Sequence, residues 1–195
     1  MGRHREFDVD EALDAALDVF WRKGYEGASY TDLTQATGVE RPALYAAFGN
    51  KEALFGLALA RYYDRYLQYF PAALAQPTSR QVVEHILHGA AELHTRFEDR
   101  RGCLGVLGAL AGSDGAAPIQ QSLIVARAAG EAALVQRLAQ ARVQGDLPEN
   151  APIAALAAFV MTLLSGMAVQ AKTGADRATL DAVARQALSA WPGSA

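Results

Sequence analysis

Three side chains that can bind phosphate groups or base edges lie near one another in this sequence, at Arg41, Tyr45 and Lys51. A lysine ammonium and a tyrosine hydroxyl donate hydrogen bonds that suit phosphate oxygens. An arginine can also donate two hydrogen bonds to a guanine edge, although Arg41 is equally compatible with a phosphate contact or a solvent-facing charge. These residue types indicate a nucleic-acid partner, provided that one short helix presents them together.

The segment from Gly38 to Phe48 has the pattern of a turn followed by such a helix. Gly38 suits the left-handed conformation that ends a helix, and Pro42 suits the first turn of the next one. Leu44 and Phe48 have helical i,i+4 spacing and can anchor one face in a core. The outward face would then carry Arg41, Ala43, Tyr45 and Ala47.

Two further helices are predicted upstream of this segment. The run from Ser29 to Asp32 has the form of a capping box, so a helix should begin after Ser29 and end at Thr37. Before it, apolar residues recur at helical spacing up to Lys23-Gly24, a basic residue followed by a terminating glycine. The order of these elements predicts a helix-turn-helix whose last short helix enters a DNA major groove.

Residues 9–59 resemble the N-terminal domain of TetR-family transcriptional regulators. The resemblance is carried by Ala16-x-x-Val19-Phe20-x-x-x-Gly24-Tyr25, Thr31-Asp32-Leu33-x-x-Ala36-x-Gly38-Val39 and Leu44-Tyr45-x-x-Phe48-x-x-Lys51-Glu52-x-Leu54. It implies an all-α fold, with a three-helix helix-turn-helix DNA-binding domain at residues 1–50 and a larger helical ligand-binding and dimerisation domain at residues 51–195. It also implies a homodimeric repressor on a palindromic double-stranded DNA operator, released when a small-molecule inducer binds the body.

The same resemblance places Tyr45 and Lys51 at phosphate contacts, and Lys51 also begins a helix whose N-terminus attracts phosphate. Ser29 and Thr31 are expected in a helix cap that also touches phosphate, while Ala43 offers only a methyl contact. The predicted DNA-contacting residues are Ser29, Thr31, Arg41, Pro42, Ala43, Tyr45 and Lys51.

The composition agrees with a helical globular protein. The 195 residues are 51% hydrophobic and 20% charged, without a sustained period-2 alternation. The single cysteine excludes an internal disulfide and the N-terminus lacks an apolar signal region, so we expect a cytoplasmic protein with no cofactor and no membrane partner. Unexpectedly for a DNA-binding domain, residues 1–52 contain six basic and ten acidic residues, a net charge of −4. We expect the acids of the first helix to face away from DNA, and Arg3 and Arg5 to add to the positive surface.

The body should consist of further helices. One should begin after Asn50 and stop at Pro71, another should begin at Arg80, and a long one should run from Pro118 to about Val143.

The stretch 151–171 contains no charged residue. By length it is a membrane-span candidate, but its alanines and polar residues favour a helix buried on nearly every side. The family resemblance implies that this helix and the last one, near 176–191, pair with their copies in the dimer.

The glycine-rich segment 102–112 should be either loose or packed closely against another backbone, because glycine weakens a helix. Within it, Cys103 is either a small core residue or a thiol activated by Arg100-Arg101. Residues 101–104 are similar to a TetR subgroup that includes the regulators of N-ethylmaleimide reductase, in which a cysteine at this place responds to electrophiles or oxidants. Lys172 matches a lysine of that subgroup.

The predicted ligand-binding residues are His88, Glu92, Cys103, Leu107, Met167 and Lys172. One face of the helix predicted to begin at Arg80 offers a possible metal site through Glu84, His85, His88 and Glu92. Such a set is more often a solvated polar face, so no metal is predicted. No catalytic constellation is present and we expect no enzyme. The alternatives are a redox- or electrophile-sensing regulator modified at Cys103 and, in another class, a helical-bundle enzyme or carrier.

Overall fold

A computed structural model of the protein describes residues 7–99, 101–109 and 116–192, and these residues contain helices and no strand, which confirms the all-α prediction. Arg3 and Arg5, which were expected to add to the positive surface, and Arg100, which was expected to help activate Cys103, lie outside the described residues. The helices are α1 (Val9–Gly27), α2 (Tyr30–Thr37), α3 (Arg41–Phe48), α4 (Lys51–Tyr66), α5 (Tyr69–Leu74), α6 (Ser79–Thr95), α7 (Leu104–Ala109), α8 (Ala117–Val143), α9 (Ile153–Lys172) and α10 (Arg177–Ser189).

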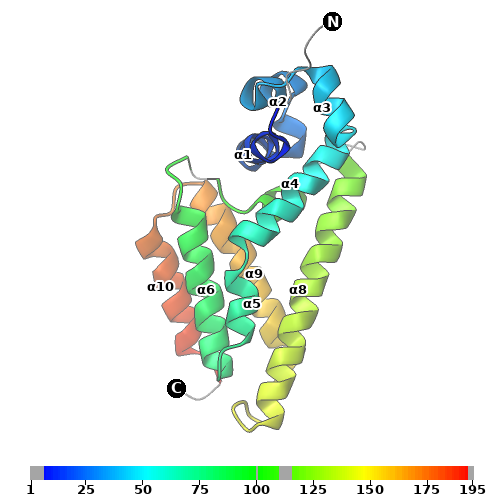
Figure 1. Ribbon diagram of the computed structural model, residues 1–195. Coiled ribbons are helices and arrows are strands. Elements are labelled where there is room, and N and C mark those ends of the chain that lie inside the picture. The colour runs from blue at the N-terminus through cyan, green and yellow to red at the C-terminus, as the bar shows by residue number, and fades with distance from the viewer. Residues whose placement is uncertain (1–6, 100, 110–115, 193–195) are drawn as a thin grey trace, which may run out of the picture.

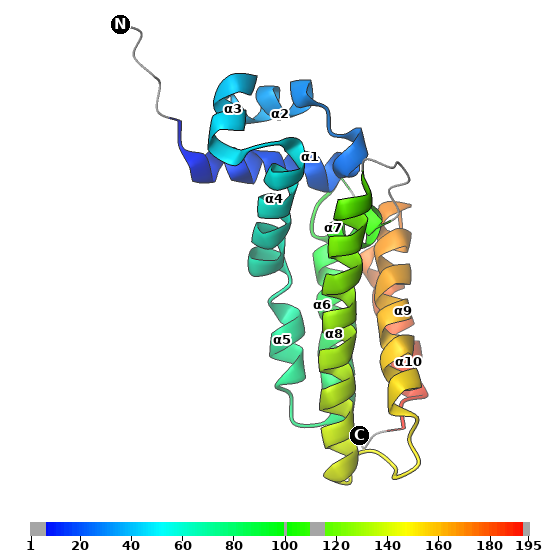
Figure 2. The same cartoon turned by 90° about the vertical axis from the view of Figure 1, so that its right-hand side faces the viewer.

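The first three helices form a head at one end of an elongated helical body (Figure 1). Figure 2 shows α1 lying across the junction between the two, with α2 and α3 on its far side. From the head, α4 descends into the body, where α6, α8, α9 and α10 run along the long axis. This arrangement places α3 in the part of the head that is farthest from the body.

Local sequence determines where the head helices end. The Ser29 hydroxyl accepts a hydrogen bond from the Asp32 backbone N–H at 3.1 Å, and the Asp32 carboxylate accepts one from the Ser29 N–H at 2.9 Å, so the predicted capping box is formed. Gly38 ends α2 with φ 66°, in the left-handed region. The Asn50 side chain caps α4 by accepting the Ala53 N–H at 2.8 Å. The predicted order of helices and turns is confirmed.

Two predicted helix ends were wrong in detail. The helix that was expected to stop at Pro71 already ends at Tyr66, because Leu67 leaves the helical region with φ −101° and ψ 12°. Pro71 instead lies in the first turn of α5, where a backbone N–H has no helical partner to lose. In α1, a kink at Gly24, whose φ is 73°, is followed by a further short helical stretch.

The head and the upper body share one hydrophobic core. Trp21 of α1 is only 1% exposed, and Phe55 of α4 is fully buried in the same cluster. The Trp21 indole makes edge contacts, at centroid distances of 4.7–5.1 Å, with the rings of Tyr62, Tyr66 and Phe97. A second core lies in the body and includes buried residues of α6, α8, α9 and α10. Since α4 is packed into the shared core along much of its length, a shift of α4 acts on both head and body.

The prediction that the uncharged stretch is buried on nearly every side was wrong for the single chain. α9 is long and apolar enough to cross a membrane, yet only 28% of its most apolar window is buried. On α9, Phe159 and Val169 are 44% and 39% exposed, and on the adjacent α8, Ile124 and Val125 are 55% and 58% exposed. In the described part of α10, the large apolar side chains are not exposed, because that helix packs on α6. The large exposed apolar side chains of this part of the body therefore lie on α8 and α9.

Two glycines after α6 are closely packed. A Cβ at Gly102, whose φ is +67°, would lie 2.9 Å from the backbone oxygen of Ala168 in α9. A Cβ at Gly108 would lie 2.8 Å from a methyl group of Leu123 in α8. Of the two alternatives for this glycine-rich segment, close packing is confirmed at these positions.

Candidate nucleic-acid interface and body cavity

The short helix α3 is anchored as its spacing predicts. Leu44 and Phe48 are 4% and 6% exposed in the core of the head. Arg41 and Pro42 are exposed at its first turn. Ala43 was expected to face outward but is half-buried against that core, because it lies beside Leu44 on the flank of the helix. The exposed small residues of α3, Ala46 and Ala47, are on its later turn.

Tyr45 belongs to a cluster with Arg41 and Tyr30. An Nη atom of Arg41 donates to the Tyr45 hydroxyl oxygen at 3.1 Å, and the Arg41 guanidinium lies 4.0 Å from the centre of the Tyr30 ring. A hydrogen bond from Tyr30, and a weaker effect of Arg41, lower the pKa of Tyr45. Because the Tyr45 oxygen accepts from both neighbours, its own O–H remains available to donate to a phosphate oxygen.

Lys51 lies next to this cluster, at the first position of α4. Its ammonium lies 4.7 Å from the centre of the Tyr25 ring, and burial lowers its pKa. The pKa of Tyr30 is raised, chiefly by its hydrogen bond to Tyr45. The Lys51 backbone N–H donates a hydrogen bond to the Tyr30 hydroxyl and opposes this rise. Tyr30 thus joins α2, α3 and α4. Sequence reasoning missed it, although an aromatic residue directly after the Ser29 cap was a signal for such a role.

Ser29 and Asp32 are committed mainly to the helix cap. The Ser29 hydroxyl donates to the Asp32 carboxylate at 2.7 Å while it accepts the Asp32 N–H. The Lys23 ammonium lies 2.5 Å from the same carboxylate and, with Ser29, holds the pKa of Asp32 well below its usual range. Thr31 is exposed on the first turn of α2. The cap therefore holds the start of α2 beside the cluster of Arg41 and Tyr45.

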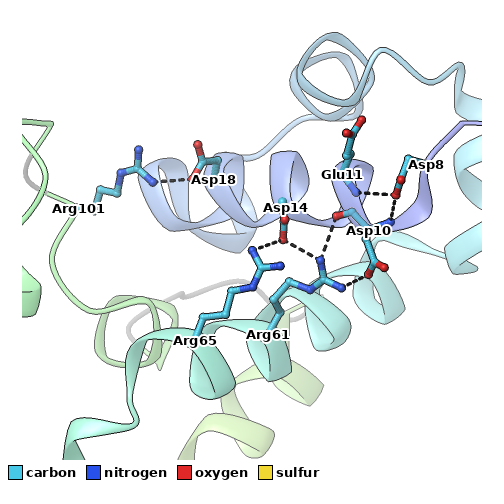
Figure 3. A network of polar contacts seen from close by, with 8 residues as sticks. All are labelled: Asp8, Asp10, Glu11, Asp14, Asp18, Arg61, Arg65 and Arg101. Atoms are coloured by element: carbon cyan, nitrogen blue, oxygen red, sulfur yellow. Dashed lines mark hydrogen bonds and ion pairs between the residues drawn. The ribbon is translucent and has the colours of Figure 1, made fainter.

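Three acidic residues of α1, Asp10, Asp14 and Asp18, are paired with arginines from later in the chain (Figure 3). Arg61 of α4 contacts both Asp10 and Asp14, and Arg65 lies 2.8 Å from Asp14. Partial burial raises the pKa of Asp14, but the two arginines outweigh this effect and lower it below its ordinary value. Arg101 pairs with Asp18 at 2.6 Å in the same way. The net charge of −4 counted over residues 1–52 thus overstates the negative charge that DNA would meet.

A cavity of about 1010 Å³ opens between the helices of the body. Its lining comes from α4, the α4–α5 connection, α5, α6, α7, α8 and α9, and is largely apolar. The Tyr63 hydroxyl belongs to it, and burial raises the pKa of Tyr63 to about 12. A cavity of this size and character suits a small organic ligand.

Of the six predicted ligand residues, Cys103 lines this cavity, and the other five do not. His88 is held at 2.7 Å from Asp181 on α10, and Glu92 faces solvent. Met167 is 2% exposed within the body core, and Lys172 donates to the Arg22 carbonyl at 3.3 Å. Leu107 packs near Gly102. Four of these five side chains therefore contact other parts of the protein, and Glu92 faces solvent.

No three His, Cys, Asp or Glu side chains are grouped as a metal site would require, as far as the described residues extend. His85 instead hydrogen-bonds to the Gln81 backbone oxygen at 2.9 Å, one turn back on α6.

Sequence reasoning gave no role to His94, which the structure places in the cavity lining. His94 is 4% exposed, and its Nδ1 has no hydrogen-bond partner. Burial lowers its pKa to about 4, although a hydrogen bond with the Gly102 backbone acts in the opposite direction. At neutral pH the ring is therefore uncharged. Only the tertiary packing around the end of α6, including the contact with Gly102, reveals this position.

Acid should destabilise the protein through His94. The unfolded chain takes up a proton near pH 6.5, whereas the folded chain resists it down to about pH 4. The stability is therefore present above pH 6.5 and is lost as pH falls toward 4, by about 3 kcal/mol over the whole window. Thermal melts should show a steeper fall in Tm between pH 6.5 and 4.5 for the wild type than for His94→Gln. Parallel curves would contradict this expectation.

The fold and these two sites define a helix-turn-helix DNA-binding protein with a ligand-sized cavity in its body. Residues 12–58 match the family model described as bacterial regulatory proteins, tetR family. The HTH-type transcriptional repressor ComR of Escherichia coli K12 is 34% identical over 193 residues, which are 98% of this chain and 92% of ComR. The repressor BdcR of the same organism is 29% identical over 95% of this chain and 90% of its own.

A solved structure extends this similarity to a protein bound to DNA. The TetR-family regulator CifR, as a cysteine mutant in complex with 26-bp double-strand operator DNA, matches with 41% identity and a TM-score of 0.91, covering 97% of this chain and 100% of CifR. This chain belongs to the TetR family of bacterial transcriptional regulators. It is a DNA-binding regulator, and its relatives are not enzymes.

Proposed function

We propose that this protein is a dimeric repressor that leaves a palindromic operator when a small molecule binds the body cavity. Residues 1–50 would bind DNA, and residues 51–195 would bind the ligand and form the dimer. The names of ComR and BdcR as repressors and the operator complex of CifR support the repressor role. A protein with this function acts on the chromosome, in the cytoplasm.

One observation carries the proposal: α4 belongs to both sites. Its first residue, Lys51, lies at the candidate DNA surface, and Phe55 is buried in the head core. At its other end, Tyr63 and Asp64 line the cavity. A ligand that displaces the lower part of α4 would therefore move Lys51 and α3. Such a ligand releases DNA only if it binds more tightly to the conformation that does not fit the operator.

At the DNA surface, we assign Tyr45 and Lys51 to phosphates and Arg41 to a base edge. Pro42 and Ala43 would approach the DNA at the first turn of α3, with Ser29 and Thr31 beside the backbone. Arg41 would leave its place over the Tyr30 ring to reach a base. This division follows from the free O–H of Tyr45 and the position of Lys51 at a helix N-terminus.

The dimer would form through α8 and α9. Their exposed apolar side chains need a cover, and a second copy supplies an identical surface across a two-fold axis. A membrane is a poorer cover, because the neighbouring α6 and α10 carry exposed charged residues along the same length of the body.

Selection of duplex DNA from a random pool by the purified protein tests this function. We expect enrichment of two inverted half-sites about one helical turn apart, bound by two protomers. The same selection with Arg41→Ala should return a broader set of half-sites. Failure to enrich any sequence, or enrichment of a single half-site, would contradict a dimeric repressor on a palindrome.

A second candidate function is control by covalent modification of Cys103. The thiol is half-buried in the cavity lining, and the Tyr62 hydroxyl donates to its sulfur at 3.5 Å. The similarity of residues 101–104 to the regulators of N-ethylmaleimide reductase supports this candidate. The contact of Lys172 with the Arg22 carbonyl does not, because it engages the lysine ammonium with α1.

N-Ethylmaleimide tests the covalent candidate directly. The thiolate would add to the maleimide double bond, and a proton would go to the neighbouring carbon. Intact mass should show one addition, since Cys103 is the only cysteine, and the selected operator should be released from the wild type but not from Cys103→Ser. Modification without release, or release of the Cys103→Ser variant, would rule out this mechanism.

A further inference from the structure

His94 is a deeply buried side chain of the cavity lining in which one ring nitrogen, Nδ1, lacks a hydrogen-bond partner. It is 4% exposed, its Nδ1 has no partner, and the ring borders the cavity. A buried polar atom without a partner costs free energy that a suitable ligand group can recover. Ser165, which also lines the cavity, differs because its hydroxyl donates to the Met161 backbone oxygen at 2.9 Å.

The surroundings of His94 determine which kind of partner its Nδ1 requires. The hydrogen bond with the Gly102 backbone favours the protonated ring, as contact with a carbonyl oxygen does. Because Nδ1 has no partner, Nε2 is the nitrogen to which we assign that contact and the ring proton. The neutral ring then presents Nδ1 as a bare acceptor.

The rest of the lining restricts the ligand further. Leu67, Phe70, Leu123 and Met161 supply apolar surface. The charged lining residues, Asp64 and Arg127, are exposed and opposite in sign, so the cavity has no excess of buried charge to attract an ion. An uncharged, largely apolar molecule fits this lining.

We propose that the cavity binds an uncharged, largely apolar molecule that bears a hydroxyl or N–H group, and that His94 Nδ1 accepts a hydrogen bond from that group. This inference rests on the proposed function in that the molecule would be the inducer. His94 would then discriminate between ligands that carry a hydrogen-bond donor and ligands of the same shape that carry none.

The position of His94 also connects the ligand to the head. The Gly102 carbonyl, which faces His94 Nε2, accepts a hydrogen bond from Trp21 Nε1 of α1 at 2.9 Å. Gly102 cannot move freely, because it lies directly against the α9 backbone at Ala168. A ligand that pulls on the His94 ring therefore acts on the same carbonyl that holds α1.

A pair of probes with matched shapes tests the proposal: 4-cyclohexylphenol, which has a donor, and 4-cyclohexylanisole, which has none. By calorimetry with the full-length protein, the wild type should bind the phenol about tenfold more tightly. His94→Phe, which keeps a planar ring but removes the acceptor, should bind both probes equally. Tyr63→Phe removes another polar group of the lining and should retain the preference.

A measurement on the wild type keeps the test valid if His94→Phe fails to fold. In protein labelled with ¹⁵N-histidine, the ring that stays neutral down to about pH 5 should show an Nε2–H tautomer. Its Nδ1 resonance should shift with the phenol and not with the anisole.

Equal binding of the two probes, no binding of either, or a preference lost in Tyr63→Phe and kept in His94→Phe would each overturn the proposal. Operator binding is measured separately without probe. A failure here with intact operator binding refutes the ligand class and leaves the repressor function standing.

Discussion

The double substitution Tyr45→Ala and Lys51→Ala is expected to weaken operator binding by about 100-fold or more, since a dimer would lose four charge-assisted phosphate contacts. Binding to unrelated duplex DNA should weaken in the same proportion, because phosphate contacts carry no sequence information. Loss of one lysine from each protomer should also reduce the slope of log K against log salt by about 2. Fluorescence anisotropy at several salt concentrations measures all three quantities.

Two variants control this experiment. Tyr45→Phe keeps the ring that packs with Tyr30 and Arg41 and removes only the hydroxyl, so its loss of affinity should be smaller. Arg185→Ala removes one exposed charge on α10, in the body, and should change nothing. An unchanged affinity or salt slope in the double variant would exclude the proposed placement of DNA on α3 and the start of α4.

The head could be predicted from sequence because its helix ends depend on neighbouring residues. The Ser29 and Asp32 side chains satisfy each other's backbone groups, Gly38 supplies a positive φ, and Asn50 caps the next helix. Each of these interactions spans only a few residues. Leu44 and Phe48 then fix which face of α3 is buried. Local chemistry thus defines the DNA-facing side of the head before any tertiary contact is known.

The cavity could not be predicted in the same way, because its lining is assembled from six helices that are distant in sequence. The pattern on α6 drew attention to His88 and Glu92, which share polarity but face α10 and solvent. His94 is on the same helix, and only packing around it removes water and leaves Nδ1 without a partner. Cys103 was identifiable because a lone cysteine after arginines is unusual by itself.

The net charge of −4 over residues 1–52 also misrepresents the head, because the partners of its acidic residues come from other parts of the chain. Asp10 and Asp14 are acidic residues of α1, but their partners Arg61 and Arg65 belong to α4, beyond residue 52. Asp18 is paired with Arg101, still farther along the chain. These pairs fasten α1 to α4 and to the segment before α7 (Figure 3). The net charge of a sequence segment is therefore a poor guide to the potential at one of its faces.

The substitution Phe159→Glu is expected to convert the protein from a dimer to a monomer at micromolar concentration. Phe159 is 44% exposed on α9, so the charge should disturb the single chain little, but a dimer would have to bury the glutamate near its own copy. Operator affinity should fall by about 100- to 10,000-fold, because a monomer holds only one half-site. Light scattering after gel filtration and anisotropy on the selected operator measure the two effects.

Ala178→Glu is the matched control, because it adds the same charge at an exposed position of α10, which has no apolar surface to cover. It should remain dimeric and bind the operator normally. A monomeric wild type, or a Phe159→Glu variant that stays dimeric, would exclude α8 and α9 as the dimer surface.

The dimer surface also concerns the ligand, since Ile124 and Val169 belong both to this surface and to the cavity lining. A second copy on α8 and α9 would therefore cover part of the cavity opening, and the Phe159→Glu monomer should release bound 4-cyclohexylphenol faster than the dimer does.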